Sequence, residues 1–134
     1  EKLVAAGFDT ARPALVASTG VSMYLTRDAV AATLRQIAGL AQGSTLAMTF
    51  LLPLELIDDA EERAQHEAVY ERARAAGTPF LSFFAPDEMI ALAHVAGFKQ
   101  ARHVSTGDLI NRYFAGRTDG LRPSSGESIL VAGT

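Results

Sequence analysis

The sequence predicts an α/β fold in which helices lie on both faces of a mostly parallel sheet. Apolar runs of strand length alternate with amphipathic segments of helix length along the 134 residues. Residues 14–17 and 45–52 are apolar without alternation, which is typical of parallel strands covered on both faces. Residues 128–132 follow the strand before them after about 20 residues without a long helix. This last strand is therefore expected to return antiparallel.

The first half of the chain begins with the end of a helix. Residues 1–8 are expected to form its last turn, ended by Gly7, so we expect the chain to be a fragment of a longer one. A strand over 14–18 follows. The next helix is predicted over 27–40, with Thr26 as its N-cap. Leu25 and Val30 are spaced as the hydrophobic staple of that helix, and Asp28 lies in its first turn.

The middle of the chain predicts a second strand and a surface helix. The strand over 45–52 ends at Pro53. A helix is expected over 58–76, with Asp58 and Glu61 spaced as a capping box. Its apolar positions are mainly alanine, so this helix should contact the core only lightly. Its acidic first turn is explained by helix stability alone.

The last third predicts a helix, an edge strand and a closing strand. Pro86 opens a helix that is expected to bury Met89, Leu92 and Val95 and to end at Gly97. Residues 98–105 are more polar, which favours a strand near an edge, and 108–115 are expected to form a short helix. The strand over 14–18 is apolar, although no upstream strand is present to pair with it. A missing N-terminal half or another copy is expected to cover its edge.

The composition excludes several classes of function. A net charge of −3 with interspersed signs gives no electrostatic footprint for nucleic acid. The absence of cysteine excludes disulfides and thiolate metal sites, and no apolar stretch approaches the ~18 residues of a membrane span. His66, His94 and His103 share no metal-ligand spacing, so no metal site is expected. Nothing at the start resembles a signal peptide, and we expect a cytoplasmic protein.

Five short segments suggest a family by their order and spacing. They are Phe-Asp-Thr-Ala-Arg-Pro at 8–13, Gly-Val-Ser-Met-Tyr-Leu at 20–25, Gly-Phe at 97–98, Arg-Thr-Asp-Gly-Leu-Arg-Pro at 117–123 and Glu-Ser-Ile-Leu-Val-Ala at 127–132. Together they resemble the C-terminal half of S-adenosylmethionine-dependent methyltransferases. The leucine carboxyl methyltransferase-like family is the most similar group. The resemblance extends over essentially the whole chain.

The resemblance implies a Rossmann-like sheet of seven strands with a reversed last strand, of which this chain supplies the fourth to seventh. In that family a glycine-rich loop after the first strand and an acidic residue after the second hold S-adenosylmethionine. Neither is present here. Residues 1–134 are therefore expected to form one domain that lacks the glycine-rich half and is inactive alone. The expected acceptor is a carboxylate or hydroxyl of a small molecule. The missing half or a second copy is the expected protein partner.

The same resemblance implies site residues after the first strand. Ser18, Thr19 and Gly20 are expected to face the methyl donor, and a simple turn with hydroxyls that cap backbone groups is the alternative. Many relatives have a glutamate at the position of Thr19. Met23 and Tyr24 are expected to line the acceptor side. Tyr24 either orients the acceptor oxygen or acts as a weak acid–base group, and a buried tyrosine with one hydrogen bond is the alternative.

Two further groups leave alternatives open. Phe80, Phe83 and Phe84 either roof a pocket, with Phe83 and Phe84 contacting the substrate, or plug the end of the core. The charged residues of 117–122 either clamp a carboxylate or pin the loop by local ion pairs. The function also has an alternative from another class. In it the chain is a non-enzymatic half-domain that associates through its open strand edge.

Overall fold

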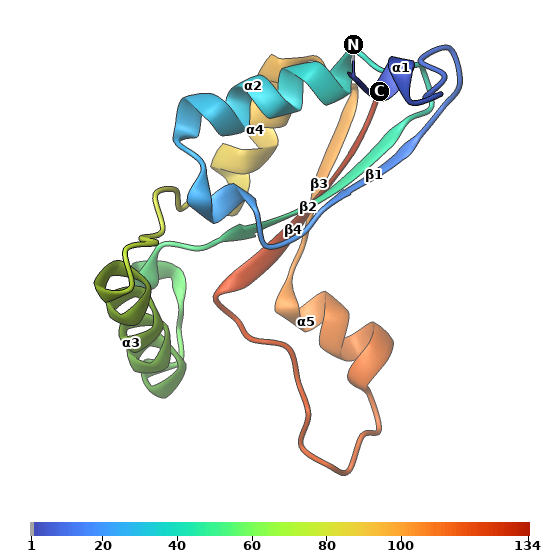
Figure 1. The fold of residues 1–134 in the computed structure, drawn as a ribbon. Coiled ribbons are helices and arrows are strands. Elements are labelled where there is room, and N and C mark those ends of the chain that lie inside the picture. Colours follow the sequence, from blue (N-terminus) through green and yellow to red (C-terminus); the bar gives the residue numbers. More distant parts are fainter. Residues whose placement is uncertain (1) are drawn as a thin grey trace.

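Four strands form one open sheet in the order β1-β2-β4-β3 (Figure 1). The structure is a computed structural model and describes residues 2–134. The strands are β1 (Leu15–Ser18), β2 (Thr45–Leu51), β3 (Gln100–Val104) and β4 (Glu127–Gly133). β1 and β2 pair in parallel, whereas β4 runs antiparallel to both β2 and β3. The predicted α/β class, with a mostly parallel sheet and a reversed last strand, is confirmed, and β3 lies at an edge as expected.

The helices lie close to the predicted positions. They are α1 (Lys2–Ala5), α2 (Arg27–Ala38), α3 (Ala60–Ala75), α4 (Pro86–Ala96) and α5 (Thr106–Leu109), with short 3-10 turns η1 (Ser22–Tyr24) and η2 (Leu54–Leu56) and a π-helical segment η3 (Ile110–Phe114). The helix end expected over 1–8 includes Glu1, which lies outside the described residues. The part that is described ends at Gly7, whose φ of 93° is left-handed.

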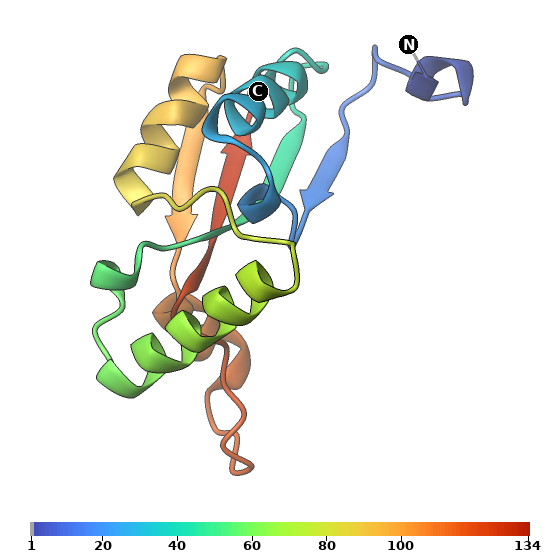
Figure 2. The same cartoon turned by 60° about the vertical axis from the view of Figure 1, so that its left-hand side comes forward.

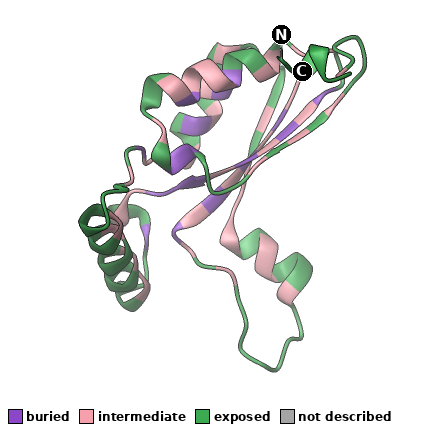
Figure 3. Ribbon diagram, in the orientation of Figure 1, coloured by how far each residue is buried: buried purple, intermediate pink, exposed green. Residues whose placement is uncertain are grey.

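The core lies between one face of the sheet and the helices α2 and α4 (Figures 1 and 3). Thr26 caps α2 by accepting a bond from the amide of Ala29, as predicted. The residues that fill this layer are Val30 and Leu34 from α2, Met89 and Ala93 from α4, and Leu46, Met48, Phe50, Leu130 and Ala132 from the sheet. The prediction for α4 was wrong at Val95, which is 80% exposed. Positions 89 and 93 are one helical turn apart and share a face, whereas 95 has rotated away from it.

Helices were expected on both faces of the sheet, and this holds on one face only. The covered face buries Leu46, Met48 and Phe50 of β2, while Ala47 and Thr49 between them stay partly exposed. On the same open face, Leu15 of the edge strand β1 is 78% exposed. The remaining long helix, α3, lies beyond the carboxyl ends of β1 and β2, apart from α2 and α4 (Figures 1 and 2). Within residues 2–134, the sheet thus has a free edge at β1 and one open face.

The cap of α3 differs from the prediction by one residue. Asp59, rather than Asp58, accepts bonds from the amides of Glu61 and Glu62, both at 2.9 Å. We expect Asp59→Ala to destabilise the first turn of α3 by about 1 kcal/mol, because two amides lose their acceptor. Hydrogen exchange of the amides at 61–63 measures the effect. Asp58→Ala is the matched control, and equal protection in both variants would contradict the observed cap.

Candidate functional site

The loop after β1 is fastened to the neighbouring strand β2. The amide of Gly20 donates to the Thr49 hydroxyl at 2.9 Å, and the buried Ser22 hydroxyl donates to the Thr49 carbonyl at 2.8 Å. Gly20 has a φ of +67°, a left-handed conformation that L-residues with a side chain adopt at a cost. The loop therefore holds a fixed shape at the carboxyl ends of two parallel strands, the edge at which α/β sheets bind ligands.

A cavity of about 280 Å³ opens beside this loop, and we call it the central cavity. The predicted residues Gly20, Met23 and Tyr24 line it together. The rest of its lining is Leu51 from β2, His66, Val69 and Tyr70 from α3, Phe80 from the loop before α4, Ser124 from the loop before β4, and Glu127 at the start of β4. An apolar cavity with a few convergent polar groups is the usual form of a small-molecule site.

One face of α3 contacts the segment before β4 through polar side chains that the sequence analysis did not predict. The His66 ring Nε2 lies 2.6 Å from the Ser124 hydroxyl. Glu62, one turn earlier, accepts bonds from the amide and hydroxyl of Ser125 and lies 3.5 Å from the Arg122 guanidinium. Positions 62, 66 and 70 share one helix face, and this spacing was the available signal. Tyr70 of the same face was also missed.

The charged residues of 117–122 form one local ion pair and one with α3. Arg117 donates to Asp119 at 3.0 Å, which lowers the pKa of that carboxyl, and Arg122 pairs with Glu62. The ion pairs favour the interpretation that these residues pin the loop before β4. Among residues 2–134, no group of three or more histidine, aspartate and glutamate side chains could hold a metal ion.

Four aromatic rings form a continuous wall beside the central cavity. Tyr24 packs on Phe80 with ring centroids 5.3 Å apart, Phe80 on Tyr70 at 5.3 Å, and Tyr70 on Phe83 at 5.1 Å. Edge-to-face and tilted pairs of this kind are favourable beyond their buried area. The Tyr70 hydroxyl is buried without a hydrogen-bond partner in the described part of the chain, and burial raises the pKa of this phenol. We call these four residues the aromatic wall.

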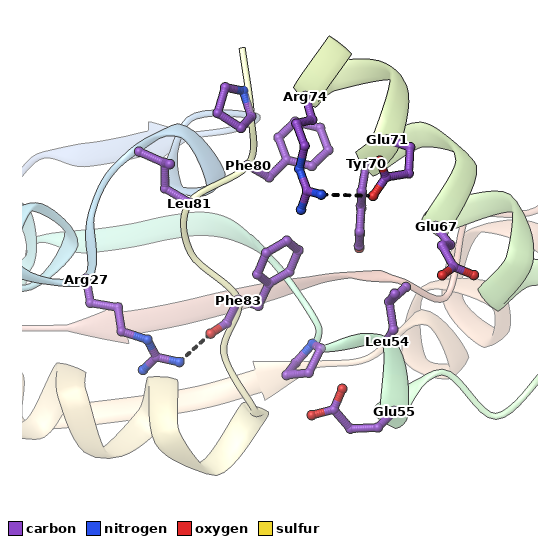
Figure 4. A pocket seen from close by; sticks show the side chains of 12 residues that line it. Arg27, Leu54, Glu55, Glu67, Tyr70, Glu71, Arg74, Phe80, Leu81 and Phe83 are labelled. Carbon is purple, nitrogen blue, oxygen red and sulfur yellow. Dashed lines mark hydrogen bonds and ion pairs between the residues drawn. The ribbon is translucent and has the colours of Figure 1, made fainter. Parts of the chain in front are cut away.

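A larger pocket of about 510 Å³, which we call the outer pocket, lies next to the aromatic wall, and Figure 4 shows the side chains that line it. Tyr70 and Phe80 line both this outer pocket and the central cavity, so the two pockets are adjacent. The further lining of the outer pocket is Arg27, Pro53, Leu54, Glu55, Glu67, Glu71, Arg74, Pro79, Leu81 and Phe83.

The remaining predicted site residues lie in three different surroundings: the outer pocket, the core and the end of β1. Phe83 lines the outer pocket. Phe84 is 1% exposed within the core, with the Arg27 guanidinium 4.5 Å from its ring centre, and this burial favours the core-plug alternative over contact with a substrate. Ser18 is half-buried at the end of β1 and Thr19 is exposed. Their role toward a donor stays a prediction.

Arg27, at the start of α2, contacts both the loop at Phe83 and the start of α4. It donates to the Phe83 carbonyl at 2.6 Å and pairs with Glu88. The bond from Arg27 is the main cause that lowers the pKa of Glu88. The stability from this pair is present above the ordinary carboxyl pKa and is lost as pH falls through the lowered one.

This pair predicts a small effect of pH. Because both side chains are about half exposed, we expect Glu88→Gln to lower stability at pH 7 by about 0.5 kcal/mol and to show a shallower loss on acidification. Thermal unfolding between pH 7 and pH 3 measures it. Asp87→Asn is the control, as the neighbouring carboxylate in the same helical turn without an ion pair in the described structure.

The sheet order, the reversed β4 between β2 and β3, and a cavity at the carboxyl ends of parallel strands define a methyltransferase-like α/β fold. A model of the leucine carboxyl methyltransferase family matches residues 1–38 of the chain. A comparison with curated proteins gave no match. Within residues 2–134, no helix has the length and apolar character needed to cross a membrane.

Three solved structures illustrate the similarity. A DUF574 family protein from Streptomyces avermitilis is 20% identical with a TM-score of 0.61, over 95% of this chain and 46% of its own. A possible exported protein from Bordetella parapertussis is 19% identical with a TM-score of 0.60, over 90% of this chain and 38% of its own. A candidate O-methyltransferase from Nostoc punctiforme is 15% identical with a TM-score of 0.54, over 90% and 31%. The chain thus spans less than half the length of each of them.

Proposed function

We propose that this chain is the C-terminal part of an S-adenosylmethionine-dependent O-methyltransferase that acts in the cytoplasm on a carboxylate or hydroxyl of a small molecule. One observation supports this most directly. Gly20, Met23 and Tyr24, which the family resemblance assigns to the donor and acceptor, line one cavity at the carboxyl ends of two parallel strands. The methyltransferase-like fold and the family match over 1–38 support the class.

The chemistry requires orientation more than reactive side chains. S-adenosylmethionine supplies a sulfonium methyl group: the acceptor oxygen forms the new O–CH₃ bond as the S–CH₃ bond breaks, which leaves a neutral thioether. Holding two reactants in line accounts for much of such a rate. In this chain the left-handed Gly20 leaves room for a close approach, and Tyr24 and His66 bring polar atoms to the same cavity. A hydroxyl acceptor also releases a proton, and His66 places a ring nitrogen at the cavity as a proton acceptor.

The donor site of this chain is incomplete, so we include a protein partner in the proposal. No glycine-rich donor loop occurs in the sequence, and the matched solved structures are at least twice as long. The free edge of β1 and the open face around Leu15 offer unpaired backbone groups and apolar side chains. The N-terminal half of a methyltransferase domain is the occupant that would complete both the sheet and the donor site.

Calorimetry with S-adenosylmethionine tests the function. The chain of 134 residues alone should show no saturable binding, and a full-length protein with a glycine-rich half should bind one equivalent. Absence of binding by the full-length protein would overturn the proposed function. Tight binding by the 134 residues alone would instead contradict the incomplete donor site.

A second function is favoured by one observation, the 78% exposure of Leu15 on the free edge strand. In this alternative the chain is a non-enzymatic module that associates with itself or a partner through β1. It predicts a stable oligomer with no affinity for the donor. Size-exclusion chromatography with light scattering distinguishes the two, since a monomer at all concentrations excludes self-association.

A further inference from the structure

We propose that the outer pocket holds the aromatic body of the methyl acceptor and selects an uncharged phenol over a carboxylic acid. The inference rests on the proposed function, because a ligand of this pocket is a methyl acceptor only if the protein is a methyltransferase. It narrows the acceptor to one chemical class. The volume of the outer pocket, about 510 Å³, falls within the usual range for small-molecule sites. The pocket shares Tyr70 and Phe80 with the central cavity, so a ligand here lies beside the cavity that Gly20 lines.

The shape of the lining favours a flat apolar ligand. Tyr70, Phe80 and Phe83 present three rings to the pocket, and Leu54 and Leu81 add aliphatic surface (Figure 4). The rings are fixed against each other, with Tyr70 tilted by 82° to Phe80 and by 51° to Phe83. Arg27 also holds the Phe83 backbone through its carbonyl. Fixed aromatic surfaces bind aromatic ligands by edge and offset contacts without first having to be ordered.

The charges of the lining disfavour an anion. The pocket has two arginines and three glutamates. Arg27 pairs with Glu88, and Arg74 lies 3.3 Å from Glu71. Glu55 and Glu67 form no ion pair among residues 2–134. Both cations are thus compensated and two anionic side chains are left over, so a carboxylate ligand would meet repulsion where a neutral phenol meets none.

The test uses two ligands with the same ring system, 2-naphthol and 2-naphthoate, titrated into the 134-residue chain. The chain has no tryptophan, so naphthalene fluorescence is measured without that background. We expect saturable 1:1 binding of 2-naphthol, about fivefold tighter than that of 2-naphthoate. Glu67→Lys should abolish or reverse this preference. Absence of saturable 2-naphthol binding, or equal binding of both probes, overturns the proposal.

Variants locate the binding. Phe83→Ala should weaken 2-naphthol binding about tenfold. Leu81→Ala should weaken it about threefold, and because Leu81 is 53% exposed the fold should tolerate this change. Tyr113→Ala, an aromatic residue 64% exposed on η3, is the control and should bind like the unmodified chain. If Leu81→Ala and Tyr113→Ala behave alike, the site lies elsewhere and the proposal fails.

Donor calorimetry keeps the two proposals distinguishable. If S-adenosylmethionine binds the full-length protein and 2-naphthol does not bind the chain, the acceptor inference fails and the methyltransferase stands. If 2-naphthol binds and the donor does not, the pocket is an aromatic site of a protein that is not a methyltransferase.

Discussion

Leu46→Ala is expected to lower the free energy of unfolding of the chain by about 2–5 kcal/mol. Leu46 is fully buried on β2 beneath α2 and α4, where its removal leaves a cavity between the helices and the sheet. The surrounding side chains come from both helices and the sheet and cannot all move to refill it. Urea unfolding measures the loss as a lower midpoint at an unchanged slope.

Leu15→Ala is the matched control for this first prediction. Leu15 is also a leucine in a strand, but it is 78% exposed on the open face, so its loss should change stability by less than about 0.5 kcal/mol. Similar losses in both variants of the chain would show that the open face is covered, which the structure does not show. Measuring the unfolding of both variants in a full-length protein tests for the proposed partner half. If that half buries Leu15, Leu15→Ala should lower the free energy of unfolding there.

The local elements of the fold could be predicted because their signals are local. Thr26 caps α2, and Pro86 begins α4, through contacts within one helical turn of the chain. Such signals can place a helix start one residue away from its true position. At α3 the cap is Asp59 rather than Asp58, because either of the two neighbouring aspartates fits the capping pattern. Val95 shows the limit of periodicity: its side chain is apolar, but burial depends on which helix face meets the sheet.

The arrangement of the elements is determined by contacts distant in the sequence. The position of β4 between β2 and β3 was not predicted, since no residue pattern within 127–133 specifies its neighbours. The open face was also not predictable. An apolar strand such as β1 has the same sequence whether its cover lies in this chain or outside it.

The part of the candidate site that follows β1 was predicted, and the part contributed by α3 was missed. Gly20, Met23 and Tyr24 follow β1 directly. His66 and Tyr70 reach the same cavity from a helix that is nearly devoid of buried residues, so its sequence indicated only a solvated surface. Their contacts with Ser124 and with Phe80 and Phe83 form only after the chain has folded.

The second large effect concerns Gly20. In a full-length protein with a complete donor site, we expect Gly20→Ala to weaken S-adenosylmethionine binding at least about tenfold, or about 1.4 kcal/mol. A Cβ built on Gly20 has no atom within 4 Å in the described structure, so the added methyl would meet the ligand rather than the protein. Calorimetric titration of the donor measures the change.

Gly116→Ala separates this effect from backbone strain. Gly116 has a φ of +79°, close to the +67° of Gly20, and a Cβ there also has no atom within 4 Å. Both substitutions therefore impose a similar strain of about 1–2 kcal/mol, and both should lower the melting temperature alike. Gly116 follows η3 and lines neither the central cavity nor the outer pocket. A donor affinity that falls only in Gly20→Ala thus reports direct approach of the ligand, and equal affinities in both variants would remove Gly20 from the donor site.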